Sequence, residues 1–133
     1  MMKLQASTIY AIRILQYLHI HRGKVLTSAE IARDVGIPHA FFLTIANQLK
    51  HTGLLSSIRG RYGGYVLGKS ACDINVYNVV LAIEGDLRIS CCFENGKLCP
   101  YGEPTSCKIH NTLHNMQDKM IEHMSGVSIA DLA

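Results

Sequence analysis

The chain has 133 residues, of which 48% are hydrophobic and 17% are charged, so it is long enough for one domain with a short appendage and too apolar for disorder. Its formal net charge of +3 permits a nucleic-acid partner without requiring one. No stretch approaches the roughly 18–20 uncharged apolar residues of a membrane span, and the start of the chain lacks a signal-peptide core. We therefore expect a cytoplasmic protein, in which five cysteines indicate metal or redox chemistry rather than disulfides.

The first part of the chain predicts three helices. Apolar side chains at helical spacing mark a helix over residues 4–22, whose inward stripe is Leu4, Thr8, Ala11, Ile12, Leu15 and Leu18. Thr27 and Glu30 have the spacing of a capping box, so a second helix begins there and ends at Gly36. Pro38 suits the first turn of a third helix, whose expected buried face is Phe41, Ile45 and Leu49. The second and third helices together predict a helix-turn-helix.

A basic hairpin is expected directly after the third helix. The apolar runs 54–58 and 65–67 are typical of short strands, and the glycine-rich segment between them allows a tight turn. Arg59 and Arg61 project from this turn, where a guanidinium can enter a minor groove or clamp phosphates. The alternative is two solubilising arginines on an ordinary hairpin. A helix-turn-helix followed by a basic wing favours DNA binding more strongly than either element alone.

The remainder of the chain predicts a fourth helix, a loop and a long final helix. Asn75 is placed to cap a helix that runs through Ile83 and ends near Gly85. Residues 86–106 lack periodicity and contain several glycines and prolines, which predicts a loop. A last helix over residues 106–124 carries one apolar face, formed by Leu113, Met116, Met120, Ile121 and Met124. With no further chain to cover it, this face is expected to pack against its twin in a homodimer.

Two groups of side chains are candidates for DNA contacts. On the outer face of the third helix, Gln or Asn can pair with adenine, and Thr or Ala can meet a thymine methyl. The candidates in the helix-turn-helix are Thr27, Ser28, His39, Ala40, Thr44 and Gln48, with Asn47 as a further one. The candidates in the wing are Arg59, Gly60, Arg61, Tyr62 and Gly63. The alternative for the helix is a solvated face, because helix-turn-helix patterns also recur without DNA.

Soft metal ligands are concentrated within 20 residues near the loop: Cys91, Cys92, Cys99, Cys107 and His110. Thiolates and imidazole suit zinc or iron–sulfur centres. Cys107 and His110 are three residues apart, so both can face the loop from the start of the last helix. The absence of a Cys-x-x-Cys pair favours an iron–sulfur cluster over zinc. Cys72 stands alone and is expected in the core rather than at a metal.

Together these segments resemble the family of small dimeric bacterial winged-helix iron–sulfur regulators that includes IscR and NsrR. The matching segments run nearly from end to end, and the most distinctive is Ser57-Ile58-Arg59-Gly60-Arg61-Tyr62-Gly63-Gly64-Tyr65-Val66-Leu67. The resemblance implies a mainly α fold with a small β-hairpin, in which a winged helix-turn-helix precedes a long C-terminal dimerisation helix. It also implies that Arg59 enters the minor groove while the third helix reads the major groove.

The resemblance further implies an iron–sulfur cluster, with [2Fe–2S] favoured and [4Fe–4S] as the alternative. The implied ligands are those of the IscR-like branch: Cys92, Cys99, Cys107 and His110, with Cys91 as the alternative to Cys92. Ile9 stands where NsrR-like members have an acidic ligand, which argues against that ligand set. Leu43 stands where IscR has a glutamate, so the base preference is not carried over.

We therefore interpret the chain as a DNA-binding transcriptional regulator, with a repressor favoured over an activator. Its binding to a palindromic operator is expected to be controlled by an iron–sulfur cluster that senses redox state, iron–sulfur status or nitric oxide. The expected division is a DNA-binding domain at 1–85, a cluster loop at 86–106, a dimerisation helix at 107–125 and a tail packing back on the body at 126–133. A cluster-free thiol switch on the same fold, through Cys91 and Cys92, is one alternative. Another is a zinc or iron–sulfur module that does not act on DNA. No catalytic grouping indicates an enzyme.

Overall fold

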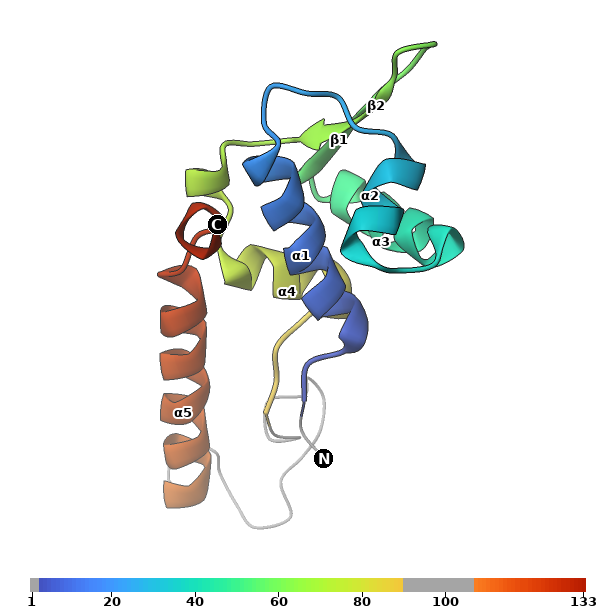
Figure 1. Ribbon diagram of the computed structural model, residues 1–133. Helices are drawn as coiled ribbons and strands as arrows, with labels where there is room; N and C mark the ends of the chain where they lie inside the picture. Colours follow the sequence, from blue (N-terminus) through green and yellow to red (C-terminus); the bar gives the residue numbers. More distant parts are fainter. Residues whose placement is uncertain (1–2, 90–106) are drawn as a thin grey trace.

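The computed structural model describes residues 3–89 and 107–133 and is mainly α-helical with one two-stranded hairpin, as predicted (Figure 1). Its elements are α1 (Ala6–Ile20), α2 (Ser28–Val35), α3 (His39–His51), β1 (Leu55–Ile58), β2 (Gly64–Leu67), η1 (Ala71–Asp73), α4 (Val76–Glu84), α5 (Lys108–Ser125) and η4 (Ala130–Leu132). Figure 1 shows α1 to α4 gathered into one body, with α5 standing beside it. No helix in these two described ranges has the length and apolarity to cross a bilayer.

The core forms where α1 packs against α2, α3 and α4. Its fully buried side chains include Ile14 and Leu15 of α1, Ile45 of α3 and Val79 of α4. The buried stripe of α1 differs from the prediction at three positions: Ile14 is buried, Ile12 is only half-buried and Leu4 is exposed. The predicted stripe began one turn too early, before the helix itself starts at Ala6.

The buried face of α3 also differs by one residue from the prediction. Phe42 is fully buried, whereas Phe41 is half-buried and meets the ring of Tyr10 edge-on, with centroids 5.7 Å apart. The full stripe of α3 is Phe42, Ile45, Ala46 and Leu49. Two adjacent phenylalanines satisfy the same hydrophobic pattern, so the phase of the helix is settled only by its packing.

Local hydrogen bonds set the ends of the helices as expected. The Thr27 hydroxyl accepts from the Glu30 amide at 3.2 Å, and the Glu30 carboxylate accepts from the Thr27 amide at 2.9 Å, which completes the capping box of α2. Gly36 ends α2 with a φ of +82°, a left-handed conformation that glycine adopts without steric cost. Asn75 and Asn78 form a second capping box at the start of α4.

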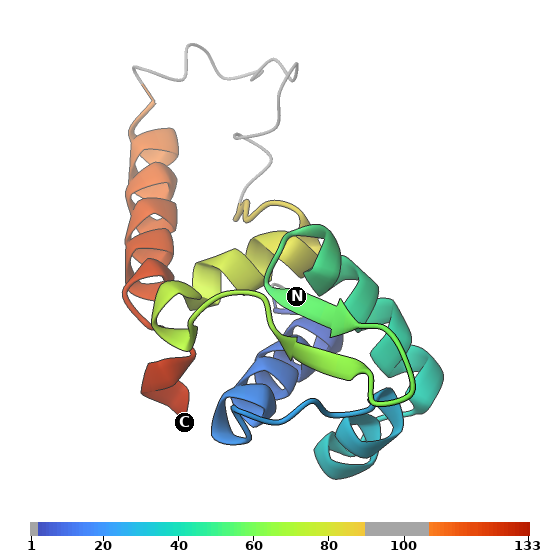
Figure 2. The same cartoon turned by 90° about the horizontal axis from the view of Figure 1, so that it is seen from above.

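Both strands of the hairpin contact the body, β1 against α3 and β2 against α1. β1 and β2 are antiparallel, with Leu55 opposite Leu67 and Ile58 opposite Gly64. Tyr65 exchanges two backbone hydrogen bonds with Leu26, of 2.7 and 3.3 Å, so the segment before α2 borders the hairpin (Figure 2). The tip of the hairpin extends beyond the body in Figure 1, which is the arrangement of a wing.

The segment after α5 returns to the body. Ile129 is fully buried, its amide donates to the Ile74 carbonyl at 2.8 Å, and the Val76 amide donates to the Val127 carbonyl at 2.9 Å. The expectation that Cys72 lies in the core is wrong. Cys72 is exposed on η1, because its neighbours Ala71 and Ile74 supply the buried side chains of that short turn.

Candidate DNA interface and metal-ligand region

The outer face of α3 is presented to solvent because its inner face is fixed in the core. Ala40, Leu43, Thr44 and Asn47 are exposed at helical spacing, whereas Gln48 is half-buried at the edge of this face. Of these, Leu43 was not among the predicted contacts, although it is 37% exposed. Leu43 lies three residues from Ala40 and four from Asn47, and this spacing in the sequence already indicates that it shares their face of the helix.

The starts of α2 and α3 are joined by a hydrogen bond between two predicted contact residues. Ser28 Oγ lies 2.7 Å from His39 Nε2, and each residue is the first of its helix. Ser28 is half-buried and His39 is exposed. The neighbouring Thr27 is exposed, and its hydroxyl oxygen already accepts from the Glu30 amide. The helix-turn-helix thus presents a linked hydroxyl and imidazole beside its outer face, groups that can donate to DNA phosphates.

A further contact fixes α2, the first helix of the helix-turn-helix, against α1. The Tyr17 hydroxyl donates to Asp34 Oδ2 at 2.5 Å, and Arg33 Nε donates to the other carboxylate oxygen at 3.0 Å. The Tyr17 hydrogen bond, followed by that of Arg33, lowers the pKa of Asp34. The same bond to Asp34 raises the pKa of Tyr17. These shifts follow from hydrogen bonds that favour the ionised carboxylate and the neutral phenol.

The tip of the wing is exposed and basic. Arg59, Gly60, Arg61 and Tyr62 are exposed, Gly63 is half-buried, and Tyr62 reaches 85% exposure. The Arg61 guanidinium lies 5.9 Å from the centre of the Tyr62 ring. The Gly63 amide donates to the Gly60 carbonyl at 3.0 Å, which closes the turn. An arginine with an aromatic ring at a protruding turn suits contact with a nucleic-acid backbone.

The segment from the end of α2 to η1, which contains α3 and the wing, has basic but no acidic side chains. Between Asp34 and Asp73 the sequence contains no acidic residue, whereas its basic residues are Lys50, Arg59, Arg61 and Lys69. Both views place α2, α3 and the wing at one end of the molecule, away from α5 (Figures 1 and 2). The helix α3 and the hairpin tip lie at the same end and carry basic but no acidic side chains, which favours attraction to the phosphate backbone.

Two of the predicted metal ligands are described, and both lie at the start of α5. Cys107 is the N-cap residue of α5 and is half-buried, and His110 follows within the first turn and is also half-buried. The predicted ligands Cys91, Cys92 and Cys99 lie outside the described residues. Among residues 3–89 and 107–133, no three Cys, His, Asp or Glu side chains are gathered at metal-binding distances.

Polar contacts follow along α5 from His110 onwards. The rings of His110 and His114 lie 6.1 Å apart, and His114 Nδ1 lies 3.1 Å from Asp118 Oδ2. The Ile89 amide donates to Gln117 Oε1 at 3.0 Å, so the last described residue before position 90 is attached to the middle of α5.

Comparison with known proteins supports the winged-helix arrangement. The model of the Rrf2 family, described as "Iron-dependent Transcriptional regulator", matches residues 4–133. "Protein aau3" of Rhizobium meliloti is 33% identical over 132 residues, which cover 98% of this chain and 84% of the relative. The HTH-type transcriptional regulator IscR of Photorhabdus laumondii is 30% identical over 115 residues, covering 86% of this chain and 68% of the relative.

Solved structures share the fold at lower identity. The structure of CymR, the global cysteine regulator of B. subtilis, has a TM-score of 0.81 at 24% identity and covers 100% of this chain and 97% of its own. T. potens IscR has a TM-score of 0.75 at 21% identity, with 98% and 85% covered. The predicted resemblance to the IscR-containing family is thus confirmed, and so is the expectation that the chain is not an enzyme. The chain belongs to the Rrf2 family and is a DNA-binding winged-helix transcriptional regulator.

Proposed function

We propose that this regulator is a homodimeric repressor whose affinity for a palindromic operator is controlled by an iron–sulfur cluster bound beside α5. The observation that carries the proposal is the position of Cys107, as the N-cap residue, and of His110, in the first turn, at the start of a helix whose opposite end is anchored in the DNA-binding body. The proposed ligands are Cys92, Cys99, Cys107 and His110, with Cys91 as the alternative to Cys92. We favour a [2Fe–2S] cluster, with [4Fe–4S] as the alternative.

The donor set described at α5 fits such a cluster. A half-buried thiol and a half-buried imidazole within one helical turn supply soft ligands near solvent, where a cofactor can be inserted. Chain reach is also adequate, because Ile89 is bonded to Gln117 and three further residues to Cys92 can span about 10 Å. Gln117 lies seven residues from His110, which is also about 10 Å along a helix.

The described segments on either side of residues 90–106 connect to the DNA-binding body. Before them, the hydroxyl of the fully buried Thr8 donates to the Glu84 carboxylate at 2.7 Å, which fixes the end of α4 against α1. After them, α5 leads to Ile129 in the core. A bound cluster would supply reversible electron transfer and sensitivity to oxidants or nitric oxide. A change in the ligand positions of Cys107 and His110 therefore moves α5 relative to a fixed body.

The two heads of a dimer must match two half-sites. In helix-turn-helix dimers these sites are separated by one helical turn of DNA, roughly 34–36 Å. Because α5 is the proposed dimer element, a shift at its start changes the spacing of the two α3 helices. If binding or loss of the cluster shifts the dimer between two spacings of the α3 helices, operator affinity changes with it.

The proposal is tested by anaerobic isolation of the wild-type protein, Cys99→Ala and the matched control Cys72→Ala. We expect brown wild-type and Cys72→Ala proteins with iron and sulfide, and a colourless Cys99→Ala protein with altered operator affinity in gel shifts. Cys72 is a suitable control because it is exposed on η1, outside the proposed ligand set. Unchanged colour and DNA binding in Cys99→Ala would contradict the proposal.

A thiol switch on the same fold is the second candidate. It is favoured by the adjacent Cys91 and Cys92 in the sequence. It is also favoured by fold similarity to Staphylococcus aureus CymR, with a TM-score of 0.74 for the structure of its oxidized form and 0.73 for a second structure. A wild-type protein that is colourless under anaerobic isolation, yet loses or gains DNA affinity on disulfide formation, would support this candidate instead.

A further inference from the structure

The outer face of α3 contains an apolar strip made of Ala40, Leu43 and Thr44. Ala40 and Thr44 are exposed, and Leu43 is 37% exposed. Thr44 Oγ1 donates to the Ala40 carbonyl at 3.3 Å, so the hydroxyl proton is used within the helix and the methyl group is left for an outside partner. Three apolar groups at positions i, i+3 and i+4 lie together on one side of a helix.

This strip has no partner within the described part of the body. The inner face of α3 is already complete, since Phe42, Ile45 and Leu49 are fully buried. The exposed neighbours of the strip on α3 include the polar His39 and Asn47, and neither α3 nor the wing contains an acidic residue. It also lies at the end of the molecule away from α5, the proposed dimer element (Figures 1 and 2). Its position is therefore that of a DNA-reading surface.

We propose that Leu43, with the methyl groups of Ala40 and Thr44, recognises the C5-methyl group of thymine in the major groove. The inference rests on the proposed DNA-reading role of α3 and names the base feature that this helix reads. Among the base edges in the major groove, thymine alone presents a methyl group, while the other groups are hydrogen-bond donors and acceptors. An apolar strip of this size offers those groups no hydrogen bond, so it discriminates by methyl contact.

The test uses a duplex enriched from a random pool by the wild-type protein. Each thymine of a half-site is replaced in turn by uracil, which removes the methyl group and leaves the base pairing and the phosphate backbone unchanged. We expect at least one replacement per half-site to weaken binding about fourfold, the ratio that corresponds to burial of one methyl-sized group. Equal affinity for every thymine and uracil pair would overturn the inference.

Protein variants assign the methyl contact to the strip. Leu43→Ala is expected to bind the thymine duplex more weakly and to reduce the thymine-to-uracil affinity ratio toward one. Thr44→Val keeps the methyl group and should retain that ratio, whereas Thr44→Ser removes the methyl, keeps the hydroxyl and should reduce it. A ratio unchanged in Leu43→Ala, or a change of oligomeric state in that variant, would overturn the inference.

The outcome is separable from that of the proposed function. A wild-type protein that enriches no duplex contradicts the proposed operator binding itself. A protein that enriches a duplex and responds to its cluster, but does not distinguish thymine from uracil, retains the proposed function and refutes only the role of Leu43.

Discussion

Asp34 illustrates how single residues hold the reading head in place. Its carboxylate accepts from the Tyr17 hydroxyl of α1 and from Arg33 of its own helix, so one side chain joins α2 to the central helix. The ring of Tyr17 also lies 4.3 Å from that of His21, centre to centre, which restricts its position. Because α3 follows α2 after a short turn, this contact bears on the orientation of the recognition helix.

The Tyr17–Asp34 contact predicts a pH-dependent contribution to stability. The pKa of Asp34 is lower in the folded state than in the unfolded state. Its contribution to the free energy of unfolding is therefore fully present above the ordinary carboxyl pKa and is lost as the pH falls through the pKa of the folded state. The pKa of Tyr17 is raised, so the contribution also persists below the ordinary phenol value of 10.0 and is lost as the pH rises through the higher folded value.

Tyr17→Phe tests this contribution while keeping the ring. We expect a lower free energy of unfolding than wild type at neutral pH, and a difference that shrinks as the pH falls below about 4. Urea unfolding of both proteins at a series of pH values between 3 and 7 measures it. A difference that stays constant over that range would show that the hydroxyl does not act through the ionised Asp34.

For single residues, the sequence predicted short-range features such as helix caps correctly, but it predicted the burial of side chains less well. The Thr27 and Glu30 capping box is confirmed, because it depends on residues three apart. The exposure of Cys72 and the choice of Phe42 over Phe41 depend on which neighbours fill the core. The Ser28–His39 hydrogen bond joins residues eleven apart and depends on the turn between two helices, which no local pattern specifies.

Among the elements, the wing depends most directly on glycine. A Cβ atom added at Gly63 would lie 2.1 Å from the Ile58 carbonyl oxygen, and one at Gly64 would lie 2.3 Å from the Leu26 carbonyl oxygen. Both obstacles are backbone atoms, which cannot rotate away as a side chain can. Glycine is therefore required at these two positions because the backbone of the hairpin passes close to other backbone segments, as well as for the conformation of the turn.

Gly63→Ala is expected to open the tip of the hairpin and displace Arg59 and Arg61. Relief of the overlap should lower the free energy of unfolding by about 1–3 kcal/mol and weaken binding to all duplexes. Gly126→Ala is the matched control, because the nearest atom to its added Cβ is 3.5 Å away and its φ is −87°. Denaturant unfolding and gel shifts measure both effects, and equal behaviour of the two variants would refute the role of close packing.

Most element boundaries followed from the sequence, and the exceptions have physical causes. The ends of α2 and α4 lie where capping residues and glycines predicted them. The last helix begins at Lys108 rather than at residue 106, because Cys107 has an extended backbone with φ of −86° and ψ of 115°. The sequence therefore placed Cys107 on the helix, whereas the structure makes it the residue that precedes it.

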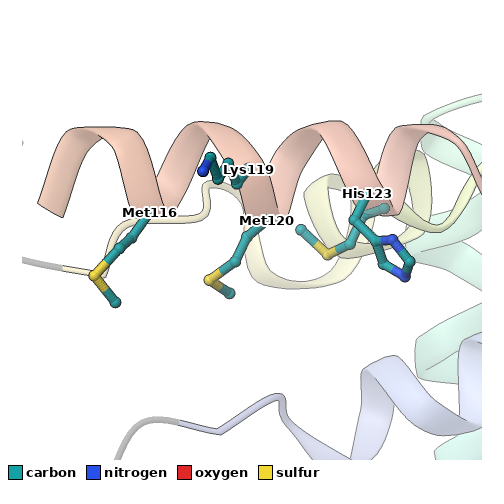
Figure 3. Close-up of a pocket in the computed structure, with 5 residues that line it drawn as sticks. Met116, Lys119, Met120 and His123 are labelled. Carbon is teal, nitrogen blue, oxygen red and sulfur yellow. The ribbon is translucent and has the colours of Figure 1, made fainter. Parts of the chain in front are cut away.

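At the scale of the whole molecule, α5 is the element whose apolar face the described residues of a single chain leave uncovered. No described side chain of this helix is buried, and Met116 is 50% exposed. Met116 and Met120 extend from the same side of α5 (Figure 3). They line a cavity of about 550 Å³ together with Lys119, His123 and Met124. A methionine-lined face of this extent suits the proposed contact with the α5 helix of a second copy.

Met120→Lys places a charge in the centre of that face and is expected to yield a monomer. A monomer engages one half-site at a time, so its operator affinity should fall by about 10²–10⁴-fold through loss of the second linked contact. The folded core should persist, because Met120 contributes no fully buried side chain to it. Sedimentation velocity measures the oligomeric state, gel shifts measure affinity, and circular dichroism checks the fold.

Asn115→Lys provides the matched control for this prediction. Asn115 is exposed, and it lies about 100° around the helix from Met116, so the same charge is added outside the methionine face. This variant should remain dimeric and bind the operator as wild type does. If Met120→Lys were also dimeric with undiminished affinity, the two reading heads would have to be joined through another surface, and displacement of α5 could not set their spacing.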